Sequence, residues 1–204
     1  MSGLREQQKQ ERRQVIAEAA LEVFIREGYE AATIDQIAAA ARVSPPTVTN
    51  YYAGGKPDIL IALLRAPDEK VLSEHLEHAF KLENPIDAMC FMEDLITENQ
   101  LRAMPRHLWR EIGPMLVGGA GAAIFKAWND STLNAAREFF HLYQNRGIFR
   151  SDFDVDFAAG LFSDLLNVEF MRLATSETAD RDAHRTHIRK MYEFLGKGFL
   201  SASS

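Results

Sequence analysis

The residues with the clearest capacity for chemistry stand together in the stretch 33–56, TIDQIAAAARVSPPTVTNYYAGGK. Hydroxyl groups donate to phosphate oxygens, an asparagine amide pairs with the edge of adenine, and an apolar ring contacts a thymine methyl group. This combination is the chemistry of a surface that contacts double-stranded DNA. The candidate DNA-binding residues are Thr33, Ser44, Pro45, Pro46, Thr47, Thr49, Asn50, Tyr51 and Lys56.

Two short helices joined by a tight turn are predicted to position these side chains. Thr33 is a preferred N-cap residue for a helix that ends near Arg42. Val43 and Ser44 form the turn, and Ser44 caps a second helix with Pro45 at its first position, where a missing N–H is tolerated. The second helix is short and almost entirely polar, so one of its faces is available to another molecule. The pattern is typical of a helix-turn-helix whose second helix enters the DNA major groove.

The candidate residues divide into two roles. Thr47 and Asn50 are the best candidates to read base edges, and the two prolines are expected to contact thymine methyl groups. The remaining hydroxyl groups and the lysine are expected to hold phosphates and to set the register of the helix on the duplex. The residues in this second role are Thr33, Ser44, Thr49, Tyr51 and Lys56.

The motif and its surroundings resemble the DNA-binding domain of the TetR (tetracycline repressor) family over about the first third of the chain. The resemblance implies a dimer formed by the final helices, a palindromic operator, a small effector held by the C-terminal helices and, most often, repression. The matching residues are Phe24-x-x-x-Gly28-Tyr29, Thr33-Ile34-x-x-Ile37-Ala38, Val43-Ser44-x-x-Thr47-Val48, Tyr51-Tyr52 and Lys56-x-x-Ile59-Leu60.

Three departures from the family pattern concern the DNA-contacting residues. Thr49 stands where an aromatic residue is usual, Pro45-Pro46 replaces a basic residue followed by glycine, and Gly54-Gly55 adds one residue before Lys56. These changes remove a positive charge and shorten one phosphate contact. They indicate a different operator sequence and a weaker affinity.

Composition describes a globular chain with an acidic C-terminal part. Of 204 residues, 47% are hydrophobic and 25% charged, and the net charge is −6. Through Lys56, seven basic residues balance seven acidic ones, so the whole deficit lies downstream. Local contacts can still position a duplex on the neutral N-terminal part. With a single cysteine, no signal peptide and no run long enough to span a bilayer, a cytoplasmic location without membrane contact is expected.

The remainder of the chain is also predicted to be helical. Start and stop signals predict roughly nine helices and no paired strand, so the fold class is all-α. They include a helix from Arg12 to Arg26, two helices capped by Asn84 and Asp154, and a short helix that Gly113 and Pro114 end.

A three-helix DNA-binding domain over residues 1–57 is followed by a helical ligand-binding and dimerisation bundle over residues 58–204. The helix over 154–176 carries apolar residues on two sides, with Leu161, Leu165 and Val168 on one of them. Two apolar sides need two partners, and the resemblance implies that a second subunit is one of them, although burial of both sides within one subunit is the alternative.

Large, adaptable side chains in the C-terminal part can line a cavity between helices. The same residues at helical spacing are also what any core requires, and for each one alone the core is the commoner role. A shortage of charged residues favours a small, largely apolar effector, aromatic or acyl, with His107, Arg110 or His141 as a polar anchor. The candidate ligand-binding residues are Met89, Met92, Trp109, Phe125, Trp128, Phe139, Tyr143, Phe162 and Phe170.

Other kinds of site have weak support in the sequence. The pairs His75 with His78 and His184 with His187 have one-turn spacing, but no further metal ligand is fixed, so no metal or other cofactor is expected. No acid–base or nucleophile arrangement indicates an enzyme. The alternatives to a DNA-binding regulator are a helical small-molecule-binding protein with a vestigial DNA-binding motif, and an adaptor that binds another protein through the same surface.

Overall fold

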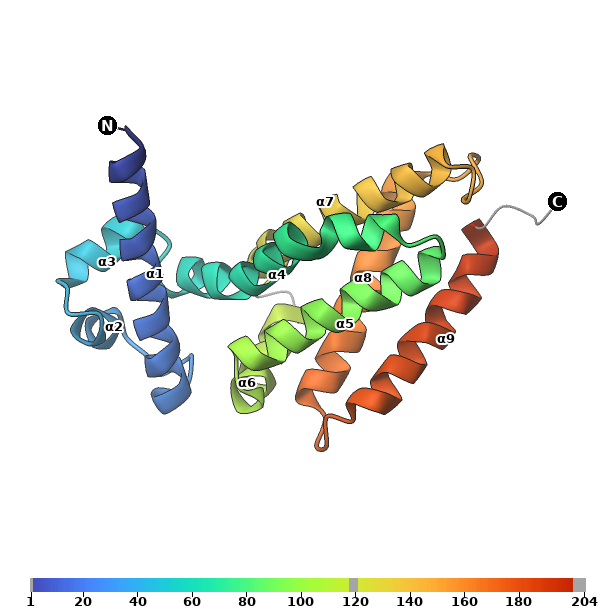
Figure 1. Ribbon diagram of the computed structural model, residues 1–204. Helices are drawn as coiled ribbons and strands as arrows, with labels where there is room; N and C mark the ends of the chain where they lie inside the picture. The colour runs from blue at the N-terminus through green and yellow to red at the C-terminus, as the bar shows by residue number, and fades with distance from the viewer. Residues whose placement is uncertain (1, 118–120, 200–204) are drawn as a thin grey trace. The chain divides into compact units, whose positions relative to one another are not determined.

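In the part of the chain that the computed structural model describes, residues 2–117 and 121–199, the protein forms nine α-helices and no β-strand (Figure 1). The all-α prediction is therefore confirmed. The helices are α1 (Ser2–Glu27), α2 (Ile34–Ala40), α3 (Pro45–Tyr51), α4 (Lys56–Lys81), α5 (Pro85–Ala103), α6 (Arg106–Val117), α7 (Ala122–Asn145), α8 (Val155–Thr175) and α9 (Arg181–Phe199).

These helices form two compact units. The first contains Met1–Ala66 and Met104–Trp128, and the second contains Pro67–Ala103 and Asn129–Ser204. The first unit therefore includes α6 and the beginning of α7 in addition to the helix-turn-helix. The predicted boundary between residues 57 and 58 remains a prediction. None of the described helices is long and apolar enough to cross a bilayer.

The first three helices of the first unit pack around a small apolar core. Ile16 and Phe24 of α1, Ile37 of α2 and Val48 of α3 are completely buried. Tyr52, directly after α3, is also buried, with 2% of its surface exposed. This core fixes which side of α3 faces inward and which side faces solvent.

Capping interactions set the ends of the predicted elements. Thr33 forms a capping box with Gln36, in which the Thr33 hydroxyl accepts from the Gln36 backbone N–H at 3.2 Å and the Gln36 side chain accepts from the Thr33 N–H at 2.8 Å. Asp154 accepts from the Phe157 N–H at 3.1 Å and caps α8 as predicted. Gly28 ends α1 with a φ of +86°, a conformation that favours glycine.

Two helices extend beyond their predicted limits. The sequence predicts α1 from Arg12, yet the helix begins at Ser2. The sequence also predicts that Gly113 and Pro114 end α6, yet the helix continues through both to Val117. Leu108, Trp109, Ile112 and Leu116 are buried along α6, so packing outweighs the hydrogen bond that the proline removes.

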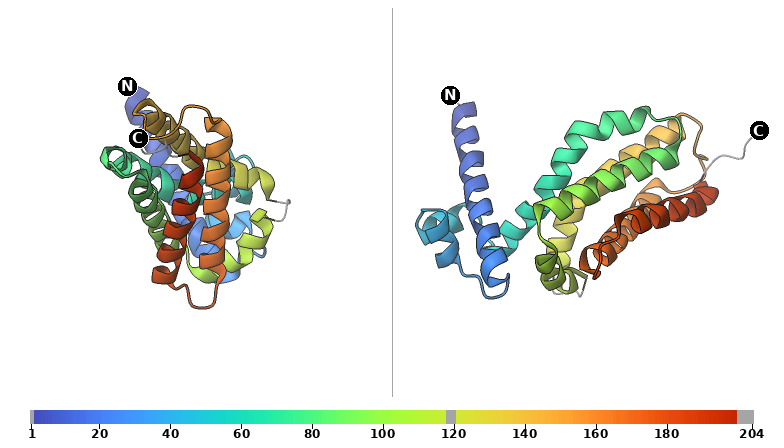
Figure 2. Two further views of the ribbon diagram at one scale, coloured as in Figure 1. Left: turned by 90° about the vertical axis from the view of Figure 1, so that its right-hand side faces the viewer. Right: turned by 60° about the horizontal axis from the view of Figure 1, so that its bottom comes forward.

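The second unit is built from α5, α8, α9 and the later parts of α4 and α7. Figure 2 shows α8 and α9 side by side, and α9 also packs against α5. The core of this unit is rich in aromatic rings. Those completely or almost completely buried are Phe139, Phe140, Tyr143, Phe149 and Tyr192.

Candidate DNA-binding and ligand-binding sites

Helix α3 has an exposed polar side and, opposite it, a buried apolar side. Val48 anchors the helix in the core, while Pro45, Pro46, Thr49 and Asn50 are exposed to solvent. Thr47 and Tyr51 are half-buried at the edges of this face. The structure therefore brings the predicted base-reading residues to the surface, as a helix in a major groove requires.

Local hydrogen bonds orient the hydroxyl groups of α3. The hydroxyl oxygens of Ser44 and Thr47 lie 2.8 Å apart, and the Thr49 hydroxyl donates to the Pro46 carbonyl at 3.1 Å. Ser44 holds the N-cap position of α3, but its side chain makes no capping bond to the backbone. Its hydroxyl instead fixes Thr47, which leaves the Asn50 amide as the longest polar side chain on the exposed face.

Tyr52 ties the end of α3 to α1. Its phenol donates to the Arg13 carbonyl at 3.0 Å, and the Arg13 guanidinium lies 4.7 Å from the centre of its ring. Burial raises the pKa of Tyr52, so the phenol stays neutral and able to donate. This anchor supports α3 from behind.

Lys56 and Thr33 make intramolecular contacts, of which the sequence predicted only the capping role of Thr33. The Lys56 ammonium donates to the carbonyls of Tyr29 and Glu30, at 2.8 Å each, and lies 5.1 Å from the centre of the Tyr29 ring. The Thr33 hydroxyl is engaged by Gln36 in the capping box. Both residues thus stabilise the connection between α1 and α2, and their phosphate contacts remain predictions.

Glu111 on α6 contacts the same connection, and sequence reasoning missed it. Its carboxylate accepts from the Glu30 backbone N–H at 3.0 Å and lies against Gly28. No motif marks this glutamate, because the contact joins residues 81 positions apart. It attaches α6 to the helix-turn-helix within the first unit.

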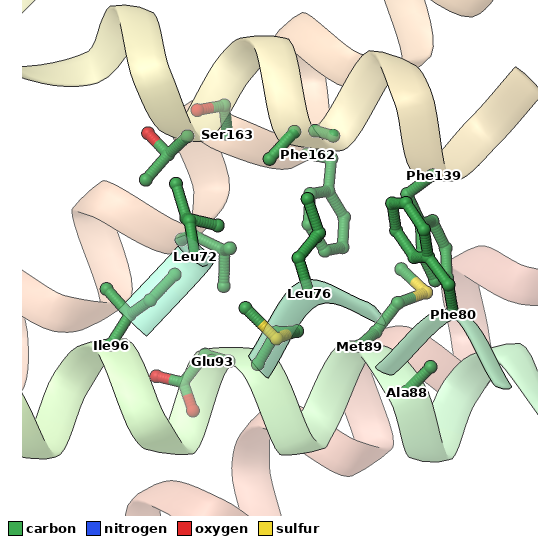
Figure 3. Close-up of a pocket in the computed structure, with 15 residues that line it drawn as sticks. Leu72, Leu76, Phe80, Ala88, Met89, Glu93, Ile96, Phe139, Phe162 and Ser163 are labelled. Atoms are coloured by element: carbon green, nitrogen blue, oxygen red, sulfur yellow. The ribbon is translucent and has the colours of Figure 1, made fainter. Parts of the chain in front are cut away.

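An apolar cavity of about 60 Å³ lies in the second unit between α4, α5, α7 and α8 (Figure 3). Figure 3 shows Phe80, Phe139 and Met89 at one end and Ile96, Leu72 and Ser163 at the other. The lining residues are Leu72, Leu76, Phe80, Ala88, Met89, Met92, Glu93, Ile96, Thr132, Ala135, Ala136, Phe139, Phe162, Ser163 and Leu166.

Four of the nine candidate ligand-binding residues line this cavity: Met89, Met92, Phe139 and Phe162. The other five do not. Trp109, Phe125 and Trp128 form an aromatic group in the first unit, with Trp128 5.9 Å from each of the other two ring centres. Tyr143 and Phe170 are buried elsewhere in the second unit.

Two buried polar groups border the cavity in place of the proposed anchors His107, Arg110 and His141, none of which lines it. Glu93 accepts from the Thr97 hydroxyl at 2.6 Å, and its carboxylate lies 2.7 Å from His184 Nε2 on α9. No group of three or more acidic, histidine or cysteine side chains suited to a metal ion occurs among the described residues.

The second polar group centres on Asn129. Its side-chain oxygen accepts from the hydroxyl of Ser163 at 2.6 Å, from the Asn167 amide at 2.8 Å and from the hydroxyl of Thr132 at 3.0 Å. Ser163 and Thr132 also line the cavity. Spacing along α7 and α8 could have suggested these residues, but polar side chains were not counted among the candidates.

The short exposed helix, its buried back and the separate helical unit with an interior cavity define an all-α helix-turn-helix protein. The family model described as bacterial regulatory proteins, tetR family, matches residues 16–63. The HTH-type transcriptional regulator TcmR of Streptomyces glaucescens is 37% identical over 87 residues. That match covers 43% of this chain and 38% of TcmR, so the chain spans little more than a third of this curated relative.

Solved structures share the whole fold. A TetR-family transcriptional regulator from Syntrophomonas wolfei has a TM-score of 0.75 at 20% identity, covering 95% of this chain and 99% of the other. Thermus thermophilus FadR, a TetR-family transcriptional repressor solved with lauroyl-CoA, has a TM-score of 0.68 at 23% identity, covering 94% and 97%. Residues 16–63 therefore match the tetR family of bacterial regulatory proteins, and the fold of the chain is shared with solved TetR-family regulators.

Proposed function

We propose that this protein is a ligand-responsive DNA-binding transcriptional regulator that represses from a palindromic operator as a homodimer, in the cytoplasm. The exposed face of α3, backed by completely buried Val48, carries the proposal. A short polar helix with one anchored side is suited to insertion in a major groove. The family match over residues 16–63 covers this helix, α2 and parts of α1 and α4.

Exposed apolar side chains on α8 and α9 support the dimer. Phe157 is 70% exposed, Phe194 is 73% exposed, and Leu161 and Val168 are also exposed. Large apolar side chains of this kind are buried when two copies of α8 and α9 pack against each other. Leu161 and Val168 belong to one of the two apolar sides of α8 that the sequence indicates.

The effector that fits the cavity is a small molecule with an aromatic or acyl body. Ligand sites usually measure about 300–1,000 Å³, so a cavity of about 60 Å³ must enlarge to admit one. Methionine and leucine side chains can change rotamer at low cost, and Met89, Met92, Leu72 and Leu76 supply them here. FadR, which was solved with lauroyl-CoA, shares this fold.

Selection of bound sites from random duplexes tests the proposal. The full-length protein should enrich a palindrome whose half-sites lie about 34–36 Å apart along the helix axis. Addition of lauroyl-CoA or 2-naphthol, as acyl and aromatic probes, should weaken binding to that palindrome. Enrichment of no sequence, together with tight binding of a probe, would instead favour the small-molecule-binding protein with a vestigial motif.

A further inference from the structure

Arg42, in the turn between α2 and α3, has an unusual backbone conformation for its residue type. Its φ is +55°, in the left-handed region where a side chain other than glycine is disfavoured. The turn is nevertheless well ordered by hydrogen bonds: the Arg42 N–H donates to Ala39 at 3.2 Å and the Val43 N–H donates to Ala38 at 2.9 Å. The backbone at this position therefore suits glycine better than arginine.

The Arg42 guanidinium is available for contact with another molecule. The residue is exposed, and within the described part of the chain no hydrogen bond, ion pair or ring contact engages its guanidinium. A strained residue whose side chain makes no intramolecular contact points to a function outside the subunit. Arg42 is also the single basic residue between Thr33 and Gly55 in the sequence.

The start of α3 lacks the groups with which a helix normally holds a phosphate. The first backbone N–H groups of a helix can bind an anion such as a phosphate. Here Pro45 and Pro46 occupy the first two positions and have no N–H, and the Thr47 N–H already donates to the Ser44 carbonyl at 2.9 Å. A helix that enters the groove at this end needs a cation from elsewhere, and Arg42 lies two residues before the Ser44 cap.

We infer that Arg42 binds a DNA backbone phosphate at the entrance of α3 into the major groove, in place of the N–H groups that the two prolines remove. The inference rests on the proposed DNA binding and adds a residue that the resemblance does not identify. Its position in the turn, before the helix, favours the phosphate wall of the groove over a base edge. The contact is therefore independent of base sequence.

The test compares the full-length wild type with Arg42→Asn and Arg42→Lys. Asparagine tolerates the left-handed conformation but carries no charge, whereas lysine keeps the charge. The matched control is Arg102→Gln, which removes one positive charge from α5 in the second unit. Each protein is titrated, between roughly 0.05 and 0.3 M KCl, with the duplex selected by the wild type and with an unrelated duplex of equal length.

Loss of one phosphate contact should lower affinity about eightfold per protomer at 0.1 M salt, or about 60-fold for a dimer. Arg42→Asn should show this loss on both duplexes and reduce the salt slope by about 1.8. Arg42→Lys and Arg102→Gln should each stay within a few-fold of the wild type. The Tm of Arg42→Asn should equal that of the wild type or exceed it by about 2–4 °C, because the strain is relieved.

Several outcomes would overturn the inference. Wild-type affinity for Arg42→Asn would exclude the phosphate contact while leaving the proposed function intact. If Arg42→Asn loses affinity only for the selected duplex and loses selectivity at one base pair, Arg42 contacts a base and not a phosphate. A lower Tm with a proportional loss of binding would make Arg42 structural. If the wild type binds neither duplex, the inference and the proposed function both fail.

Discussion

The exposed face of α3 is uncharged, and under the proposed function its base selectivity depends on the Asn50 amide, the Thr47 hydroxyl and two proline rings. Asn50 is exposed and has the longest reach among the polar groups. An asparagine amide pairs with adenine, and the prolines favour thymine methyl groups. With no arginine or lysine on α3 to read guanine, we expect A·T pairs at the positions that face the helix.

Replacement of Asn50 by alanine should remove base selectivity without disturbing the fold. The lost bidentate pair is worth about 1–3 kcal/mol of discrimination in each half-site. Electrophoretic or fluorescence titration should show weaker binding to the operator, with unchanged binding to an unrelated duplex. Asn134→Ala, which changes an exposed asparagine on α7, is the control. Unaltered operator selectivity in Asn50→Ala would exclude Asn50 as a reader.

The thiol of Cys90 should be unreactive near neutral pH. Burial raises the pKa of the Cys90 thiol to about 11, and the thiolate is the reactive form. Because the raised pKa lowers the thiolate fraction, alkylation by iodoacetamide at pH 7.5 should be at least about tenfold slower than for free cysteine. The rate should rise steadily between pH 7 and 9, and denaturant should abolish the difference. Cys90 is the only cysteine, so mass spectrometry reports it directly.

At the scale of the helices, local signals predicted the starts of α2, α3, α5 and α8 but not the start of α1. The caps Thr33, Ser44, Asn84 and Asp154 are short-range features, so the sequence reveals them. The first turns of α1 have no apolar period, and they are supported by polar pairs four residues apart. These pairs are Gln7 with Glu11, Gln10 with Glu6 and Gln14 with Glu18.

Only some of the residues that line the candidate cavity could be predicted, because side chains from four different helices form its walls. Four of the large side chains chosen from the sequence, Met89, Met92, Phe139 and Phe162, line this cavity, and their role in ligand binding remains a prediction. Apolar spacing along each helix cannot tell which inward residues of different helices meet. Trp109 and Trp128 are as buried as the lining residues, yet they contact each other in the first unit. For the same reason, the contact between Glu111 and the Glu30 backbone could not be predicted from the sequence.

Filling the cavity should separate effector binding from DNA binding. Ala136 on α7 lines the cavity and is 8% exposed, so Ala136→Leu places a larger side chain in that space. An apolar cavity of about 60 Å³ accepts part of this volume, and we expect the free energy of unfolding to change by no more than about 1–3 kcal/mol. Isothermal titration should show weaker binding of the acyl or aromatic probe, with operator affinity retained.

The control for this change is Ala123→Leu, the same substitution at an exposed position of α7. It should leave both binding activities unchanged. If Ala136→Leu binds the probe as tightly as the wild type, the effector occupies another part of the molecule, and the aromatic group of Trp109, Phe125 and Trp128 becomes the next candidate.

At the scale of the whole molecule, DNA binding and dimerisation are assigned to different surfaces. The neutral N-terminal part is proposed to bind DNA, and the exposed apolar side chains of α8 and α9 are proposed to join the two subunits. The first 56 residues are neutral, so repulsion from DNA phosphates falls on the acidic remainder of the chain. Two reading helices offset this repulsion better than one, because each half-site adds its own contacts. Operator affinity should therefore depend strongly on dimerisation.

Disruption of the exposed apolar surface on α8 and α9 tests this dependence. The double change Phe157→Glu and Phe194→Glu puts charges at two positions that are 70% and 73% exposed, so each subunit should still fold. Two like charges facing their copies in a symmetric interface should convert the dimer to a monomer in analytical ultracentrifugation. Affinity for the full palindrome should then fall to that for a single half-site.

Leu4→Glu is the control for added charge, since Leu4 lies on α1 and is 64% exposed. It should leave the sedimentation coefficient unchanged. Circular dichroism of the double variant should remain helical, which separates loss of association from loss of fold. If the double variant still sediments as a dimer, another surface joins the subunits. If the monomer binds the palindrome as tightly as the wild type, the two reading helices do not act together.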